Sequence, residues 1–136
     1  MISRLEQFST MRVLVIDDYQ ANVDLLLALL LGQGLQCVTG ETDSRRVPAL
    51  LPVVNPDLVL LDLQMPNVDG QEVLEEITKF AGDTYLPVLV LTGGITTKVR
   101  DRALANGAHD FLTKPLDLAE VILRVANLLE SRKSLC

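Results

Sequence analysis

Short apolar runs alternate along this chain with longer segments in which apolar residues recur at helical spacing. The runs are rich in Val, Ile and Leu, which is typical of strands buried on both faces of a parallel sheet. The pattern predicts strands over about 12–17, 35–39, 57–62, 87–92 and 110–113. It predicts helices over about 20–31, 71–80 and 98–106, and from 117 onward. Such alternation indicates βαβ units, and hence an α/β fold.

The segment between the second and third strands breaks the helical pattern. Ser44 is a candidate N-cap, but Pro48 and Pro52 stand four residues apart where a helix is expected. Proline inside a helix removes one N–H, and its ring crowds the carbonyl four residues back. We therefore predict a short or kinked second helix, and a regular helix from Arg45 through Asn55 would contradict this.

The later helices carry clearer signals. Asp117 and Glu120 form a predicted capping box at the start of the last helix. Apolar side chains predicted to face the sheet are Val73, Leu74 and Ile77 in the third helix, and Leu118, Val121, Ile122, Val125 and Leu129 in the last. Cys37 is predicted to be a buried residue of the second strand.

Polar residues stand where the apolar runs stop. Asp17 and Asp18 close the first run, Asp62 closes the third, Thr92 closes the fourth, and Lys114 follows the fifth. Because the carboxyl ends of parallel strands meet at one edge of a sheet, these side chains should converge there. A carboxylate cluster beside a lysine suits a hard divalent cation and a phosphoryl group.

This arrangement resembles the CheY-like receiver domain of two-component response regulators, over roughly Arg12 to Glu130. The polar elements occur in the family's order and at its separations. The resemblance implies a doubly wound, flavodoxin-like, five-stranded parallel sheet of order 2-1-3-4-5, with helices on both faces. We expect residues 1–11 to be an N-terminal extension and 12–130 the receiver domain. Residues 131–136 are expected to form a C-terminal tail, for which the start of a linker to an output domain is the alternative interpretation.

The resemblance also implies a role for each site residue. Asp62 is the expected phosphoacceptor, and Lys114 is the counter-charge for the phosphoryl oxygens. Mg²⁺ is the expected cofactor, bound by Asp18, Asp62 and the backbone carbonyl of Gln64, with Asp17 acting largely through water. Asp17 and Asp18 could instead be ordinary residues at the entry to a helix. That interpretation is credible for one of the two acids but not for both.

The same resemblance implies roles for further positions. Thr92 and Phe111 form the expected switch, in which the hydroxyl bonds the phosphoryl group and the aromatic ring rotates into the vacated space. Core packing is an equal alternative for Phe111. Gly93 leaves the phosphoryl group accessible, and Pro115 follows a cis bond that aims the lysine inward. Gln64 and Gly94 occupy positions that tune the lifetime of the acyl phosphate.

Composition narrows the class of function. Net charge is −6, and the 12 basic residues form no cluster, which argues against direct nucleic-acid binding. The longest apolar stretch, Leu25 to Leu31, is far too short to cross a bilayer. The N-terminus lacks an apolar signal core, so a cytoplasmic location is expected. Cys37 and Cys136 have no metal-ligand spacing.

These observations predict a signalling module rather than an enzyme. A sensor histidine kinase or phosphotransfer protein would phosphorylate Asp62, and the switched state would control a partner or a linked output domain, such as an HD-GYP phosphodiesterase. The face formed by the fourth helix, fifth strand and fifth helix is the expected homodimer surface. A haloacid-dehalogenase-type phosphohydrolase is one alternative. That family has an acidic residue two positions after the nucleophile as its general acid–base, and this chain has Gln64 at that distance from Asp62. A phosphate-independent binding domain is another, against which the intact acid pair, Thr92 and Lys114 count.

Overall fold

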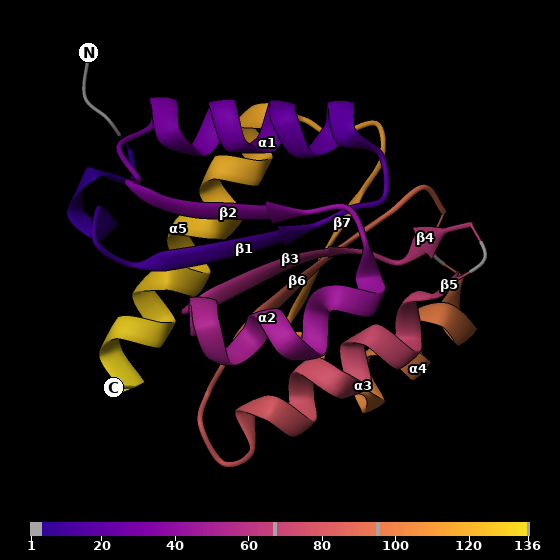
Figure 1. Ribbon diagram of the computed structural model, residues 1–136. Coiled ribbons are helices and arrows are strands. Elements are labelled where there is room, and N and C mark those ends of the chain that lie inside the picture. Colours follow the sequence, from indigo (N-terminus) through magenta and orange to yellow (C-terminus); the bar gives the residue numbers. More distant parts are fainter. Residues whose placement is uncertain (1–3, 67, 95, 136) are drawn as a thin grey trace.

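A computed structural model describes residues 4–66, 68–94 and 96–135 and shows one parallel five-stranded sheet (Figure 1). The strands of this sheet are β1 (Arg12–Ile16), β2 (Cys37–Glu41), β3 (Leu58–Asp62), β6 (Val88–Thr92) and β7 (Asp110–Thr113). Their spatial order is β2-β1-β3-β6-β7. Because β4 (Gln64–Met65) and β5 (Val68–Asp69) form only a small antiparallel hairpin, this is the predicted order 2-1-3-4-5. The predicted fold is confirmed.

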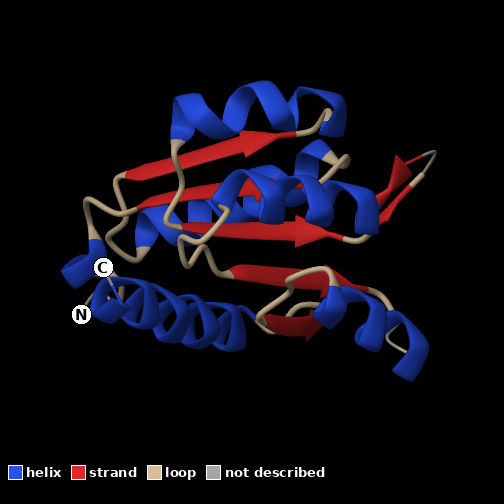
Figure 2. Ribbon diagram, turned by 90° about the horizontal axis from the view of Figure 1, so that it is seen from below, coloured by secondary structure: helices blue, strands red, loops and turns tan. Residues whose placement is uncertain are grey.

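Helices cover both faces of the sheet (Figures 1 and 2). They are η1 (Glu6–Phe8), α1 (Gln20–Gly32), η2 (Ser44–Arg46), α2 (Val47–Val54), α3 (Gly70–Ala81), α4 (Thr97–Ala105) and α5 (Leu118–Leu135). Residues of α1 and α5 share one apolar cluster, and residues of α2, α3 and α4 share the other. The sheet therefore separates two hydrophobic cores.

Strand β1 shows how the sequence supplies both cores at once. Val13 and Val15 belong to the cluster under α1 and α5, whereas Leu14 and Ile16 belong to the cluster under α2 and α3. All four are fully buried, because successive strand residues point to opposite faces of a sheet that is covered on both sides. Each such burial stabilises the fold by about 1.5–3 kcal/mol, which explains why these runs are apolar throughout.

The second helix is short, as predicted. A 3₁₀ turn precedes α2, which begins at Val47, contains Pro52 and ends at Val54. The next residue, Asn55, has the left-handed conformation, with φ 48°. Ser44 is not the cap: the side chain of Asp43 accepts a hydrogen bond from Arg45 N–H at 3.0 Å, and Ser44 is buried. Asp43 can do this because it has the extended backbone of a capping residue.

The second strand begins two residues later than predicted. Leu35 is buried, but it lies in the turn after α1, where its N–H donates to the carbonyl of Leu30 at 3.2 Å. Cys37, predicted to be buried, is exposed. The reason is that β2 is an edge strand, so its side chains are less covered than those of the central strands.

The start of α5 differs from prediction in two details. Leu118 is exposed rather than buried, because it lies in the first turn, whereas Val121, Val125 and Leu129 one or more turns later fill the core. Asp117 caps the helix by accepting from Ala119 N–H at 3.0 Å. Glu120 pairs with Arg124 at 3.6 Å, so the reciprocal half of the capping box is not formed.

Both ends of the described chain pack against the sheet at the edge opposite the acid residues. Leu5 and Phe8 are buried in the same cluster as Leu128 and Leu129 of α5. One turn later, Arg132 Nε donates to Asp57 Oδ1 at 3.2 Å, and Arg132 Nη1 donates to the carbonyl of Tyr85 at 2.7 Å. The other Asp57 oxygen accepts from Arg12 N–H at 2.8 Å. Asp57 thus ties the far end of α5 to β1 and β3.

Candidate functional site

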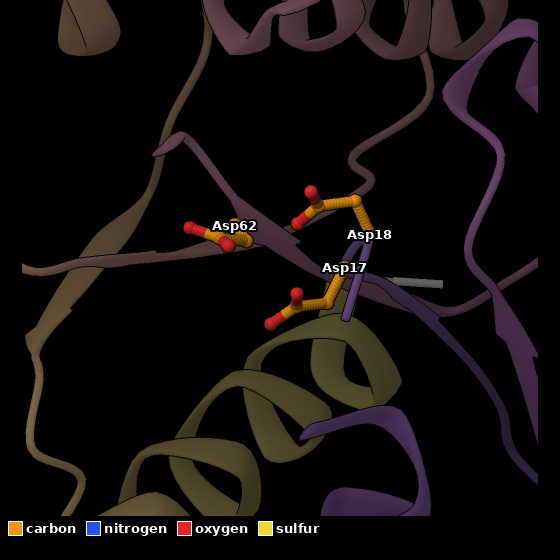
Figure 3. Close-up of side chains that lie close together, drawn as sticks. All are labelled: Asp17, Asp18 and Asp62. Carbon is orange, nitrogen blue, oxygen red and sulfur yellow. The ribbon is translucent and has the colours of Figure 1, made fainter. Parts of the chain in front are cut away.

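Three carboxylates meet at the carboxyl-terminal edge of the sheet, and Figure 3 shows them pointing to the same side. Asp17 and Asp18 follow β1, and Asp62 ends the neighbouring strand β3. One oxygen from each lies within 4.8 Å of the other two. Asp17 and Asp62 are buried, whereas Asp18 is exposed. This oxygen-rich cluster is of the kind that hard divalent cations bind.

Lys114 brings a positive charge to this cluster from the end of β7. Its Nζ lies 3.0 Å from Asp62 Oδ2 and 3.7 Å from Asp17 Oδ2. The other Asp62 oxygen, Oδ1, accepts from Gln64 N–H at 2.9 Å. Both oxygens of Asp62 are therefore held in place, one by the Lys114 ammonium and one by a backbone N–H.

The electrostatics of the site disfavour the ionised form of Asp62. Burial raises the pKa of the Asp62 carboxyl above its ordinary value, and the neighbouring Asp17 carboxylate acts in the same direction. The hydrogen bond from Gln64 N–H and the Lys114 ammonium lower the pKa without reversing the shift. A cation bound among the three carboxylates would relieve this cost, because it favours the charged form.

Thr92 ends β6, the strand beside β3, where Asp62 pairs with Leu91. Its side chain is buried, and its hydroxyl donates to the carbonyl of Gly94 at 3.2 Å. Gly93 N–H donates to Gln64 Oε1 at 2.8 Å. The loops that follow β3 and β6 are therefore tied to each other beside Asp62.

The two remaining predicted residues lie on or after β7. Phe111 is half-buried and packs against the apolar cluster on the α2–α4 side of the sheet. The peptide bond between Lys114 and Pro115 is cis. The structure therefore brings Asp17, Asp18, Asp62 and Lys114 together and places Thr92 and Gly93 on the adjacent strand end. Phe111 is positioned by core packing.

Two contacts to Asp17 were not found from the sequence. Asn22 Nδ2 donates to Asp17 Oδ2 at 3.1 Å, and Tyr19 N–H donates to Oδ1 at 3.0 Å. Asn22 lies near the start of α1, where Gln20 and Asp24 are also polar, so no signal in the sequence singled it out. These bonds fix the orientation of Asp17 while Lys114 faces its second oxygen.

The comparison with protein families decides the class. A model described as the response regulator receiver domain matches residues 13–126. The chain belongs to this family. It is a receiver domain of two-component response regulators. This family match gives no support to the phosphohydrolase alternative.

Similar curated proteins include a transcriptional regulatory protein and a response regulator. The receiver domain is 35% identical over 121 residues to the transcriptional regulatory protein TrcR of Mycobacterium tuberculosis, covering 89% of this chain and 46% of that protein. It is 36% identical over 117 residues to the response regulator PleD of Caulobacter vibrioides, covering 86% of this chain and 26% of that one. The chain thus spans half or less of the length of these curated relatives.

Solved structures show the same fold. The receiver domain of the Francisella response regulator 1452 superposes with a TM-score of 0.78 at 28% identity, covering 90% of this chain and 98% of that chain. A CheY-like receiver domain from Methanospirillum hungatei JF-1 gives 0.84 at 22% identity, covering 93% of this chain and 98% of that one. Within the described ranges, no helix of the receiver domain has the length and apolar character needed to cross a membrane.

Proposed function

We propose that the receiver domain accepts a phosphoryl group on Asp62 from a histidine kinase or a phosphotransfer protein. The observation that carries this proposal is the Asp62–Lys114 pair, 3.0 Å apart, within a cluster of three carboxylates at the sheet edge. The phosphorylated state would then act on an output domain or a partner protein. A cytoplasmic location is part of the same proposal.

The donor set fits Mg²⁺. Asp18, Asp62 and the backbone carbonyl of Gln64 are the proposed ligands, and Asp17 acts through water. When bound, Mg²⁺ would neutralise the carboxylates and polarise the phosphoryl oxygens. The raised pKa of Asp62 supports this role, because a bound cation favours the ionised carboxylate that burial and the neighbouring Asp17 disfavour.

In the transfer, an ionised Asp62 oxygen attacks the phosphorus of a phosphohistidine. The P–O bond forms as the P–N bond breaks, and the imidazole leaves with the electron pair and takes up a proton. Such transfers need positioning and charge stabilisation more than covalent help. Lys114 provides the charge, since its Nζ already contacts Asp62 Oδ2.

The proposed switch begins at Thr92. Its hydroxyl would leave the Gly94 carbonyl and bond the phosphoryl group, which frees the loop before α4. Helix α4 is suited to move, because Ala103 is its one buried residue within the described part of the chain. Phe111 either follows Thr92 or stays as a core residue, and both interpretations are consistent with its half-buried position.

Two exposed apolar surfaces are available for partners. Helix α1 begins beside the acid cluster and exposes Leu25 and Leu31, so we assign this face to the phosphodonor. Leu104 of α4 and Leu123 of α5 are also exposed, on the face proposed for a homodimer. A covalently linked output domain is included in the proposal, because relatives such as PleD extend well beyond the matched region.

Intact mass spectrometry after incubation with acetyl phosphate and Mg²⁺ tests the proposal. We expect one added phosphoryl group, which Asp62→Asn and a chelator should both abolish. Asp83→Asn is the matched control, because Asp83 is an exposed acid in the loop after α3. Beryllofluoride binding, monitored in parallel, detects a site whose acyl phosphate hydrolyses too fast to accumulate. Failure of the folded wild type in both assays would refute the proposal.

A further inference from the structure

Gln64 contacts the site in two separate ways. Its backbone N–H holds Asp62 Oδ1 at 2.9 Å, and its side-chain Oε1 accepts from Gly93 N–H at 2.8 Å. The second contact spans 29 residues and joins the loop after β3 to the loop after β6. Gln64 is exposed, so its side chain can leave this position without disturbing the core.

The N–H that donates to Gln64 Oε1 belongs to Gly93, which directly follows β6, a strand that pairs with β3 beside Asp62. Leu63 N–H donates to the Leu91 carbonyl, and Lys114 N–H donates to the Thr92 carbonyl, so the sheet ladder continues up to this point on both sides of β6. Gly93 follows directly, and its N–H has Gln64 Oε1 as its recorded partner. Backbone N–H groups at the carboxyl edge of a parallel sheet are the usual donors to bound phosphate groups.

Thr92 strengthens the same connection. Its hydroxyl donates to the Gly94 carbonyl, so two bonds hold the residues that follow β6 in their resting position. A cavity of about 270 Å³ lies next to them and is lined in part by Gln64, Thr92 and Gly94. The Gln64 side chain therefore has space into which it can turn.

We infer that the Gln64 side chain is a resting-state latch on Gly93 N–H, and that a phosphoryl group on Asp62 takes over this N–H. The latch and the phosphoryl group then compete for one donor. Phosphorylation releases the loop at two points, because Thr92 leaves Gly94 as Gln64 leaves Gly93. Gln64 is thus a positioning residue for the acceptor site. The inference rests on the proposed phosphorylation of Asp62.

Gly93 offers an independent way to break the latch. A Cβ at this position would lie 2.6 Å from Gln64 Oε1, the end of a flexible side chain. Its backbone φ is outside the left-handed region, so alanine fits the local conformation. Gly93→Ala should therefore displace the Gln64 side-chain amide while keeping the backbone N–H of residue 93. Gln64→Ala instead removes the amide group itself.

The test is a beryllofluoride titration with Mg²⁺, followed through the backbone amide signals of Gly93 and Gly94 by NMR. We expect Gln64→Ala to lower the midpoint by about two- to twelve-fold, the effect of one net hydrogen bond on an equilibrium constant. In the free protein, the Gly93 amide signal should shift and exchange faster. Gln36→Ala, which alters an exposed glutamine before β2, is the control and should leave both unchanged.

A double-mutant cycle separates the latch from any direct effect of the new methyl group. Gly93→Ala should favour beryllofluoride binding more when Gln64 is present than when Gln64→Ala is already in place. Equal effects in both backgrounds, or a Gln64→Ala midpoint that is unchanged or raised, would overturn the inference. A wild type that neither binds beryllofluoride nor is phosphorylated by acetyl phosphate would instead refute the proposed function. Failure of the latch and failure of the proposed function are therefore distinguishable.

Discussion

Replacing Arg132 with glutamine should destabilise the receiver domain far more than the same replacement at Arg45. Both arginines make a two-point contact. Arg45 Nε and Nη2 each donate to an Asp43 oxygen at 3.0 Å, and Arg132 donates to Asp57 and to the Tyr85 carbonyl. The difference is burial, because the Arg45 side chain is 87% exposed and that of Arg132 is 14% exposed.

The magnitude follows from what each change leaves unpaired. Arg132→Gln leaves a carboxylate oxygen of Asp57 and the Tyr85 carbonyl without their donor in a region largely closed to water. Hydrogen bonds to charged groups are worth about 1.5–3 kcal/mol, and a fully buried broken pair costs about 3–5 kcal/mol. Asp57 keeps its bond from Arg12 N–H, so we expect about 2–3 kcal/mol and a Tm lower by about 6–15 °C.

Urea unfolding followed by circular dichroism measures this difference, and the chain has no Trp to follow by fluorescence. Arg45→Gln should unfold at nearly the wild-type midpoint, because exposed ion pairs contribute little. If Arg132→Gln loses less than about 1 kcal/mol, or no more than Arg45→Gln, the assignment of Arg132 as a buried anchor of α5 is wrong.

Three further changes test the site and its surroundings. Asp62→Asn should raise the Tm near pH 7. The pKa of Asp62 is raised in the folded state, so the wild type loses stability as the pH rises from the ordinary pKa of the carboxyl through its folded pKa. Mg²⁺ should raise the Tm of the wild type but not of this variant. His109 Nδ1 accepts from Val88 N–H, and burial lowers the pKa of His109, so stability should fall as pH drops from 6.5 toward the folded pKa. Urea midpoints between pH 8 and 5 should show this slope in the wild type and a flatter one in His109→Leu. Gly107→Ala should cost about 1–3 kcal/mol by the same assay, because Gly107 has φ 108° and its Cβ would collide with Thr78; wild-type stability in this variant would contradict the strain argument.

Burial on both sides of the sheet made the central strands easy to predict from the sequence. Strands β3 and β6 are buried at every position, so an unbroken apolar run identified them within a residue of their ends. Strand β2 is only partly buried, and Leu35, a buried apolar residue two positions before it, displaced its predicted start toward the preceding turn. Leu5 and Phe8 were missed because a three-residue helix has no periodicity to detect.

The candidate site divides in the same way. Strand-end position alone was enough to predict that Asp17, Asp62 and Lys114 meet, because parallel strands end at one edge. The side-chain contacts of Gln64 and Asn22 depend on rotamers and loop conformation, which no local pattern encodes. The resemblance gave Gln64 a metal-binding carbonyl and a position that tunes the acyl phosphate lifetime, but it did not predict the contact of its side chain with Gly93.

The packing of residues 5–8 and 128–132 against the sheet means that the unit that folds is larger than the unit shared across the family. The family model matches residues 13–126, yet Leu5, Phe8 and Leu129 lie outside those limits and are buried. A fragment cut at these limits would leave a hole in one core and lose the Arg132 anchor as well. In chimeras that transplant this receiver, the junctions should therefore be placed outside 5–133, because a cut inside these limits would destabilise the receiver itself.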